Sequence, residues 1–224
     1  MGSLAFRLMI VSLNEIETTV LKAARGAGME WGLAEEAARA ASSLARLGLA
    51  WETPLLGVLE SAPWRTPPVL DGMRLRPGSA DAWLCPIRSG AFISDLGEDA
   101  PAIIERVLFP ILLLPFAAPR QGELAREPAR ELAWDGVTVR LEAGTVAIAP
   151  PRARSLDAAR ADEVALRPAR IARKGEAPQR GLPAGVVVAA GRWAELQGYE
   201  ARTYVPASTK SRLRGAGPAS SDND

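Results

Sequence analysis

The chain of 224 residues contains no histidine and one cysteine, Cys85. Without histidine it has no Ser-His-Asp or Cys-His catalytic set, no histidine-based zinc motif and no histidine pH switch. One cysteine excludes an intrachain disulfide and any zinc or iron–sulfur site built from several cysteines. An enzyme built on this chain would therefore rely on tyrosine, carboxylate or cysteine chemistry.

Long hydrophobic runs and lysine are also scarce. The longest apolar run, Val107–Ala118, contains two prolines and is shorter than the roughly 20 residues of a membrane helix. The run Leu8–Val11 is too short for the core of a secretion signal. Only 3 of the 27 basic residues are lysine, which reflects either codon usage in a GC-rich genome or a preference for bidentate anion binding. We predict a cytoplasmic protein that binds no membrane.

The charge balance excludes another large class of function. The 27 basic and 26 acidic residues give a net charge of +1 and a sequence pI of about 7.9. Nucleic-acid-binding modules usually carry a strong basic patch and a high pI. We therefore predict no nucleic-acid partner.

The N-terminal quarter has the periodicity of helices. Ser12 and Glu15 form a capping box, and apolar residues at helical spacing then continue to a stop at Gly26 and Gly28. A second helix is expected at about residues 33–47, and Pro54 opens a short third one.

After Ser61, glycine and proline break the chain into short segments. The runs Ala82–Ile87 and Ala91–Ser94 read as strands. Asp99 is expected to cap a helix from Ala100 that continues to Ile111. The range 131–150 predicts a three-stranded meander, with its first tight turn at Asp135-Gly136.

These elements predict an α+β fold, with a helical N-terminal subregion packed on a mixed, mostly antiparallel sheet of short strands. Residues 1–9 are assigned to an N-terminal extension. A single domain is expected at 10–214, with a helical part at 10–62 and a β-rich part at 63–214. Residues 215–224 are small and polar, which is typical of a C-terminal tail.

Both ends of the chain resemble one bacterial family. The N-terminal stretch contains SLNEIE at 12–17, KAARGAG at 22–28 and WGLAEE at 31–36. The C-terminal stretch contains RTYVPAS at 202–208, then Ser211-Arg212, a GAG turn at 215–217 and a closing DND. In these segments the chain resembles the domain of unknown function 3726 family, which implies a bacterial protein and no particular activity. Lys210 and Pro218 depart from the closing pattern of that family.

The KAARGAG turn is the first candidate site. Lys22 and Arg25 lie beside two glycines ahead of a helix, and such a turn can bind an anion through its backbone N–H groups. The alternative is an ordinary helix C-cap in a helical hairpin, with the two cations complementing the helix dipole.

Carboxylates and the cysteine are further candidates. Glu35, with Glu36, Glu15 and Glu17, can supply acid–base chemistry or, alternatively, form a solvated helix face paired with arginine. Cys85 lies three residues before Arg88, which can lower a thiol pKa. In a strand those two side chains point to opposite faces, so a buried structural cysteine is the alternative.

The C-terminal motif concentrates hydroxyls and guanidiniums, which suit a carboxylate or phosphate. Tyr204 is a candidate general acid where histidine is absent, and the alternative is a surface loop. Because domain termini often lie close together, the two ends are expected to meet and form one small-anion pocket. Its predicted ligand-binding residues are Lys22, Arg25, Arg202, Ser208, Ser211 and Arg212, and its predicted catalytic residues are Tyr204 and Glu35.

Three functions follow, with no metal site expected and the cofactor unknown. The first is a non-catalytic accessory protein of a metabolic enzyme, which binds a small anionic metabolite and a protein partner. The alternatives are a small-molecule enzyme using Tyr, carboxylate and Arg chemistry, or a simple ligand-binding module. An accessory protein needs an exposed apolar patch, for which Ile111–Phe116 is the candidate.

Overall fold

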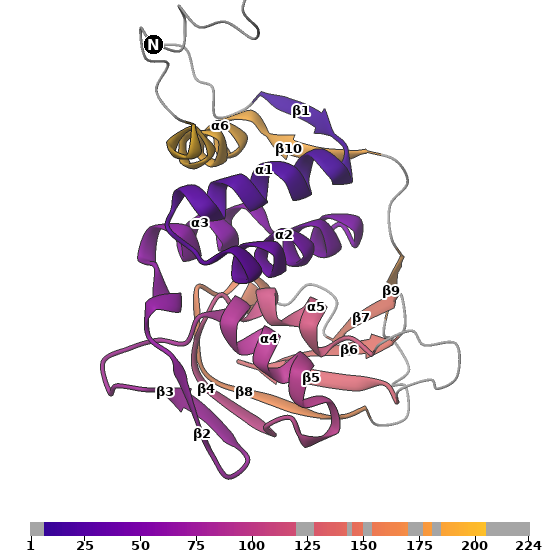
Figure 1. Ribbon diagram of the computed structural model, residues 1–224. Coiled ribbons are helices and arrows are strands. Elements are labelled where there is room, and N and C mark those ends of the chain that lie inside the picture. Colours follow the sequence, from indigo (N-terminus) through magenta and orange to yellow (C-terminus); the bar gives the residue numbers. More distant parts are fainter. Residues whose placement is uncertain are drawn as a thin grey trace, which may run out of the picture.

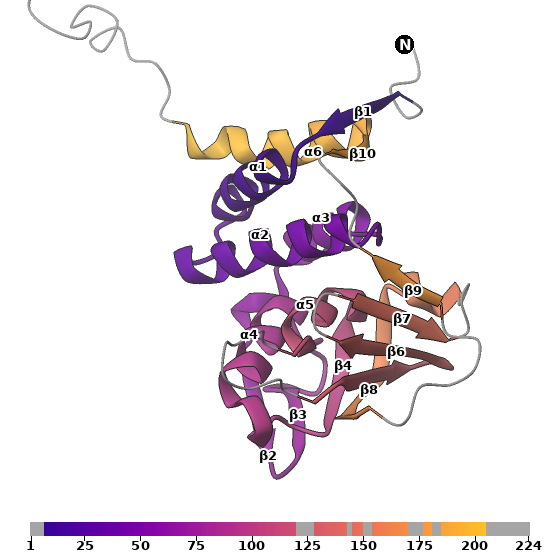
Figure 2. The same ribbon diagram turned by 90° about the vertical axis from the view of Figure 1, so that its right-hand side faces the viewer.

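The computed structural model describes residues 7–119, 128–142, 145–149, 154–169, 177–180 and 185–204. Figures 1 and 2 show these residues arranged in layers, with helices stacked above a twisted sheet. The predicted α+β fold is confirmed: a helical N-terminal subregion lies on a mixed, mostly antiparallel sheet. One hydrophobic cluster contains buried residues from both parts.

The helical layer begins with α1 (Leu13–Gly26), α2 (Trp31–Arg46) and α3 (Glu52–Ser61). The capping box that opens α1 is present: Ser12 Oγ accepts from Glu15 N at 3.1 Å, and Glu15 Oε2 accepts from Ser12 N at 2.7 Å. Both side chains satisfy backbone donors that the first helical turn leaves unpaired.

The C-terminal elements return to this helical layer. Strand β10 (Val186–Ala189) pairs antiparallel with β1 (Leu8–Val11) in a two-stranded sheet, and α6 (Ala190–Glu200) lies against α1. The backbone N–H of Ala189 donates to Oε1 of Glu52 at 3.1 Å, which fastens β10 to α3. The segment 186–200 was expected in the β-rich part, and β1 begins within the expected N-terminal extension.

The larger sheet has eight strands among the described residues, in the order β2-β3-β4-β8-β5-β6-β7-β9. Among these described strands, only β3 and β4 pair in parallel. The strands are β2 (Pro68–Asp71), β3 (Arg74–Pro77), β4 (Ile103–Leu108), β5 (Arg130–Trp134), β6 (Val137–Glu142), β7 (Thr145–Ala149), β8 (Arg160–Pro168) and β9 (Ala177–Arg180).

The predicted meander is confirmed in β5, β6 and β7. Asp135 and Gly136 both have positive φ, at 43° and 79°, as a two-residue hairpin turn between right-twisted strands requires. Val137, Val139 and Leu141 alternate into the core, so the period-2 pattern in the sequence identified the buried face.

Two expectations about the middle of the chain are wrong. The segment after Ala100 forms strand β4 rather than a helix. Ile104 and Val107 are both buried, three residues apart, because Arg106 between them has φ of +52° and interrupts the alternation. Apolar residues three apart are typical of one face of a helix, so the sequence pattern predicted a helix here.

The second error concerns residues 82–94, expected to be strands. Most of this segment is helix α4 (Pro86–Leu96), and only Leu84 forms an isolated bridge, to Val107. Pro86 at the first helical position and the Cys85 cap start this helix.

Helices α4 and α5 (Leu114–Ala117) lie between the helical layer and the sheet (Figure 2). The apolar residues Ile111, Leu112, Leu113, Leu114 and Phe116 are at most 8% exposed there. The exposed patch expected at 111–116 is therefore wrong, because these side chains fill the core between the two parts. The exposed large hydrophobic residues lie on other elements, chiefly Leu8, Ile10 and Val187 on β1–β10 and Val69, Leu70 and Met73 around the β2–β3 hairpin.

Candidate functional site

The two ends of the described chain meet where α1 lies against α6. Lys22 Nζ, on α1, lies 3.0 Å from Oε1 of Glu200, the last residue of α6. The hydroxyl of Tyr204 donates to the same oxygen at 2.5 Å, and Lys22 Nζ lies 5.8 Å from the centre of the Tyr204 ring. These three residues are called the Lys22 cluster below. It brings together Lys22 and Tyr204 from the two ends of the chain, as the sequence led us to expect.

Glu200 shifts the pKa values of the other two residues of the Lys22 cluster. Its hydrogen bonds raise the pKa of Lys22 and the pKa of Tyr204. Burial acts to raise the pKa of Glu200 itself, but hydrogen bonds from Tyr204 and Lys22 outweigh that effect and the pKa is lowered. At neutral pH, Glu200 is therefore ionised and balances Lys22, while Tyr204 keeps its proton and shares it with Glu200. This arrangement fastens α6 to α1.

Arg25 and Glu35 belong to a second cluster, centred on Trp31. Arg25 Nη1 donates to the backbone oxygen of Met29 at 2.6 Å, and its guanidinium carbon lies 5.6 Å from the centre of the Trp31 ring. Trp31 Nε1 donates to Oε1 of Glu35 at 2.8 Å. Arg202 lies over a third aromatic ring, Tyr199, at 4.4 Å.

The backbone of the KAARGAG turn has the hydrogen bonds of a helix C-cap. The N–H groups of Ala27, Gly28 and Met29 donate to carbonyl oxygens of α1. Gly26 also permits a close helix contact, because a Cβ atom there would lie 1.9 Å from the backbone oxygen of Tyr199. These observations support the structural interpretation of the turn.

The remaining predicted ligand-binding residues, Ser208, Ser211 and Arg212, lie outside the described residues. The small-anion pocket at the chain ends therefore stays a prediction. Within the described part, the structure brings Lys22 together with Tyr204, while Arg25 and Glu35 contact Trp31 instead.

Cys85 is the side-chain cap of α4 and is 1% exposed. Its Sγ accepts a hydrogen bond from the backbone N–H of Arg88 at 3.5 Å. Burial raises the pKa of this thiol to about 11, so it is protonated at neutral pH. This supports a structural cysteine, although its setting is a helix start rather than the expected strand.

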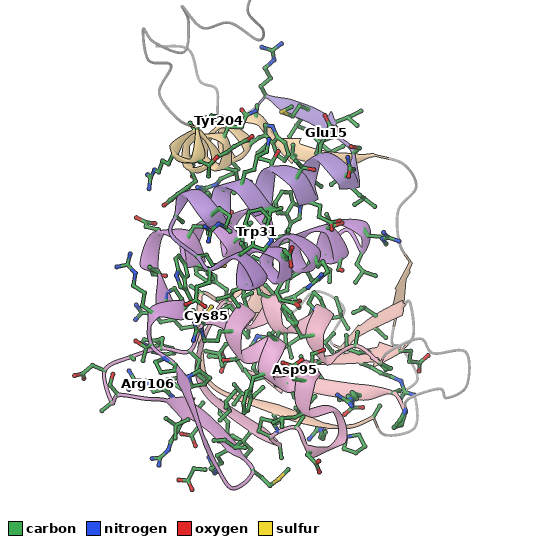
Figure 3. All side chains as sticks on the ribbon, in the orientation of Figure 1. Glu15, Trp31, Cys85, Asp95, Arg106 and Tyr204 are labelled. Carbon is green, nitrogen blue, oxygen red and sulfur yellow. The ribbon has the colours of Figure 1, made fainter. Side chains whose placement is uncertain are left out.

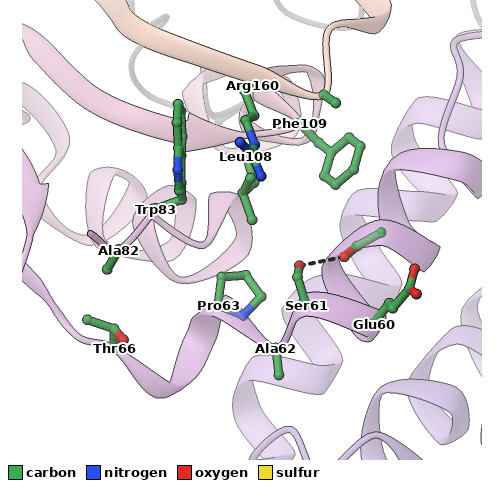
Figure 4. A pocket seen from close by; sticks show the side chains of 12 residues that line it. Glu60, Ser61, Ala62, Pro63, Thr66, Ala82, Trp83, Leu108, Phe109 and Arg160 are labelled. Atoms are coloured by element: carbon green, nitrogen blue, oxygen red, sulfur yellow. Dashed lines mark hydrogen bonds between the residues drawn. The ribbon is translucent and has the colours of Figure 1, made fainter. Parts of the chain in front are cut away.

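A pocket that the sequence did not predict lies between the helical layer and the sheet (Figure 4). Its volume is about 440 Å³. Helix α3 supplies one wall, and the ends of β4 and β8 with the segment before α4 supply the others. We call it the Trp83 pocket; its lining includes Glu60, Ser61, Trp83, Leu108, Phe109 and Arg160.

Two arginines converge on Trp83. The guanidinium carbons of Arg106 and Arg160 lie 5.1 Å and 5.0 Å from the centre of its ring. Among the described residues, neither guanidinium has a carboxylate within ion-pair distance. Contact with a ring uses the face of a guanidinium and leaves its in-plane N–H groups available for an oxyanion.

Strained backbone surrounds the same pocket. Ala62 and Phe109, which line it, have φ of 48° and 44°, and Arg106 has φ of 52°. At Arg106 the strain turns the side chain outward, since a regular strand with Ile104 in the core would also point residue 106 inward. Backbone of this kind concentrates at ligand sites.

Gly57 lets Phe109 reach α3. A Cβ atom at position 57 would lie 2.2 Å from Cζ of Phe109, so a glycine is required for the ring to pack there. Phe109 is also fixed by its own N–H, which donates to the backbone oxygen of Ala159 at 2.9 Å. The aromatic wall of the Trp83 pocket is thus held by α3 and by the residue that precedes β8.

Sequence reasoning missed Glu200, Trp83, Arg106 and Arg160. No spacing pattern connects them, because Trp83, Arg106 and Arg160 come from three separate segments. The available signal was compositional: a tryptophan in a Pro- and Gly-rich stretch, in a chain with an unusual excess of arginine.

The described residues contain neither a cluster of metal ligands nor a helix of membrane-spanning length. They hold no group of three or more His, Cys, Asp or Glu side chains placed to bind a metal ion. They also include no helix that is both long and apolar enough to cross a bilayer.

Comparison with known proteins finds a family match for the first part of the chain. Residues 11–89 match the family described as "Protein of unknown function (DUF3726)", which confirms the resemblance over that range. The match spans α1, α2, α3 and Trp83 of the pocket; the C-terminal motif lies beyond it. No curated protein and no solved structure matches the chain.

Proposed function

We propose that this chain is a non-catalytic binding protein for a small organic anion, held in the Trp83 pocket with its negative group on Arg160. One observation carries the proposal. Arg160, whose guanidinium has no carboxylate partner among the described residues, lines a pocket of about 440 Å³ beside Trp83, and the guanidinium of Arg106 contacts the same ring. Pockets of this size, mostly apolar with a few polar groups, are typical of small-ligand sites.

The lining favours binding over catalysis. Ser61 Oγ donates its proton to the backbone oxygen of Gly57 at 2.6 Å (Figure 4), so among the described residues this proton is not held by a side-chain base. Tyr204, the predicted general acid, lies at the α6 end of the molecule, far from Arg106 (Figure 3). A protein that binds a metabolite without converting it fits the accessory role expected from the sequence, in which it would serve a metabolic enzyme.

The test is a thermal-shift and calorimetry screen with hexanoate, benzoate and inorganic phosphate. An anion at about 100 times its Kd should stabilise the native protein by roughly 2.7 kcal/mol, a shift of several degrees in Tm. Arg160→Gln should abolish that shift. Arg46→Gln, which changes an exposed arginine on α2, is the matched control and should leave the shift intact.

Two results would overturn the proposal. One is the absence of any anion-dependent shift in the unaltered protein. The other is a shift that persists in Arg160→Gln, since the anion would then bind elsewhere. The variant without ligand should unfold near the temperature of the parent chain, because Arg160 is exposed. The predicted site at the chain ends is tested separately by Arg212→Ala, which should not change binding in the Trp83 pocket.

A further inference from the structure

The Trp83 pocket carries opposite charges on opposite walls. Arg160 projects from the start of β8, and Glu60 projects from α3 on the other side (Figure 4). Like Arg160, Glu60 has no ion-pair partner among the described residues. A cation and an anion therefore line one cavity, and neither forms an ion pair within the part of the chain that the structure describes.

Most of the lining between these charges is apolar. Ala62 and Pro63 line the pocket after α3, and Leu108 and Phe109 line it at the end of β4. A simple organic anion would satisfy Arg160 but leave Glu60 unpaired, and a second negative group would be repelled by Glu60. A ligand with one group of each sign, joined by an apolar chain, complements all three features.

We infer that the ligand is a zwitterion, in which a carboxylate binds Arg160 and an ammonium group binds Glu60 across an apolar chain. Its chemical class is that of the ω-amino carboxylates. The guanidinium accepts the carboxylate through paired N–H donors, and Glu60 supplies the acceptor oxygens that an ammonium group requires. This inference rests on the proposed function, because both place the carboxylate on Arg160.

The experiment compares matched ligands by calorimetry at low salt. The probes are 6-aminohexanoate, hexanoate, which lacks the ammonium group, and hexylamine, which lacks the carboxylate. Because its ammonium group adds one charged contact, with Glu60, 6-aminohexanoate should bind about tenfold more tightly than hexanoate. Chains of four and eight carbons then measure how far apart the two charges lie.

Two variants assign the ends of the ligand. Glu60→Gln should reduce the affinity for 6-aminohexanoate to that for hexanoate and leave hexanoate binding unchanged. Arg160→Gln should weaken both carboxylates. Glu17→Gln, a change to an exposed glutamate on α1, should alter neither.

The outcomes separate the two proposals. If hexanoate and 6-aminohexanoate bind equally, or if Glu60→Gln weakens both alike, the zwitterion inference is wrong while anion binding stands. If neither carboxylate binds, the proposed function fails, and the inference fails with it. Binding of hexylamine that equals binding of 6-aminohexanoate would contradict the role of Arg160 in both.

Discussion

Lys22 and Glu200 form an ion pair at 3.0 Å although 178 residues separate them in the chain. The side chain of Glu200 is 12% exposed, and Tyr204 donates to the same carboxylate oxygen that receives Lys22. This contact joins α6 to α1, at opposite ends of the described chain. The sequence suggested Lys22 as a ligand-binding residue and Tyr204 as a general acid. In the structure both bind the carboxylate of Glu200, which the sequence did not single out.

The pH dependence of this contact has a definite sign. Tyr204 and Lys22 lower the folded-state pKa of Glu200 despite its partial burial. A depressed carboxyl pKa gives stability that is complete above the ordinary glutamate value of about 4.3 and is lost as pH falls through the folded value. Glu200→Gln should therefore lower Tm at pH 7 by about 1–3 °C, a modest effect because the pair is partly solvated.

Thermal unfolding from pH 7 to pH 3 measures this effect. The difference in Tm between the two proteins should shrink below pH 4, as the native carboxylate is protonated. A difference that stays constant across the range would show that the ion pair does not contribute. Glu195→Gln, at an exposed i,i+3 pair with Arg192, is the control for a surface ion pair.

Gly26→Ala should destabilise the protein by about 2 kcal/mol or more. Its Cβ would lie 1.9 Å from the backbone oxygen of Tyr199, so α1 and α6 would have to separate. Gly32→Ala is the matched control, because a Cβ there meets nothing within 4 Å and alanine favours the helix by roughly 0.5–1 kcal/mol. Urea unfolding gives both values, and equal effects at the two positions would contradict the close contact.

Ala62→Gly should stabilise the protein by about 1 kcal/mol. Ala62 ends α3 with φ of 48° and ψ of 46°, a left-handed conformation that costs alanine more than glycine. The comparison is Ala194→Gly on the exposed face of α6, which should destabilise by roughly 1 kcal/mol, since glycine weakens a regular helix. The two substitutions are chemically identical, so differential scanning calorimetry should show shifts of opposite sign. Shifts of the same sign would disprove the left-handed cap.

Cys85 should resist thiol reagents in the native state. Its pKa of about 11 leaves roughly one molecule in a thousand as thiolate at pH 8, and its side chain is 1% exposed. Reaction with a disulfide reagent should be absent in native buffer and reach one thiol per chain in guanidinium chloride. Complete labelling of the native protein within minutes would contradict the buried helix-cap position.

Local patterns predicted the elements whose own residues decide them. The Ser12–Glu15 capping box started α1, and the Asp135-Gly136 turn gave the β5–β6 hairpin. Both depend on hydrogen bonds or dihedral angles within a few residues. The segment 103–108 was predicted as a helix because its apolar spacing is altered by the left-handed conformation of Arg106, which no local sequence pattern predicts. The segment is a strand because it pairs with β3 and β8.

The sequence by itself determined the chemistry that this protein can use. It contains no histidine, one cysteine and 24 arginines, and these counts exclude whole classes of site in any fold. Tertiary structure alone decided which side chains share a site. Trp83, Arg106 and Arg160 meet because β4 pairs with β8 and bridges to Leu84. Glu60 lines the same pocket as Trp83 and Arg160 because α3 packs against Phe109. Such contacts depend on packing between distant segments, whose free energy is spread over the whole core and leaves no periodic signal in the chain.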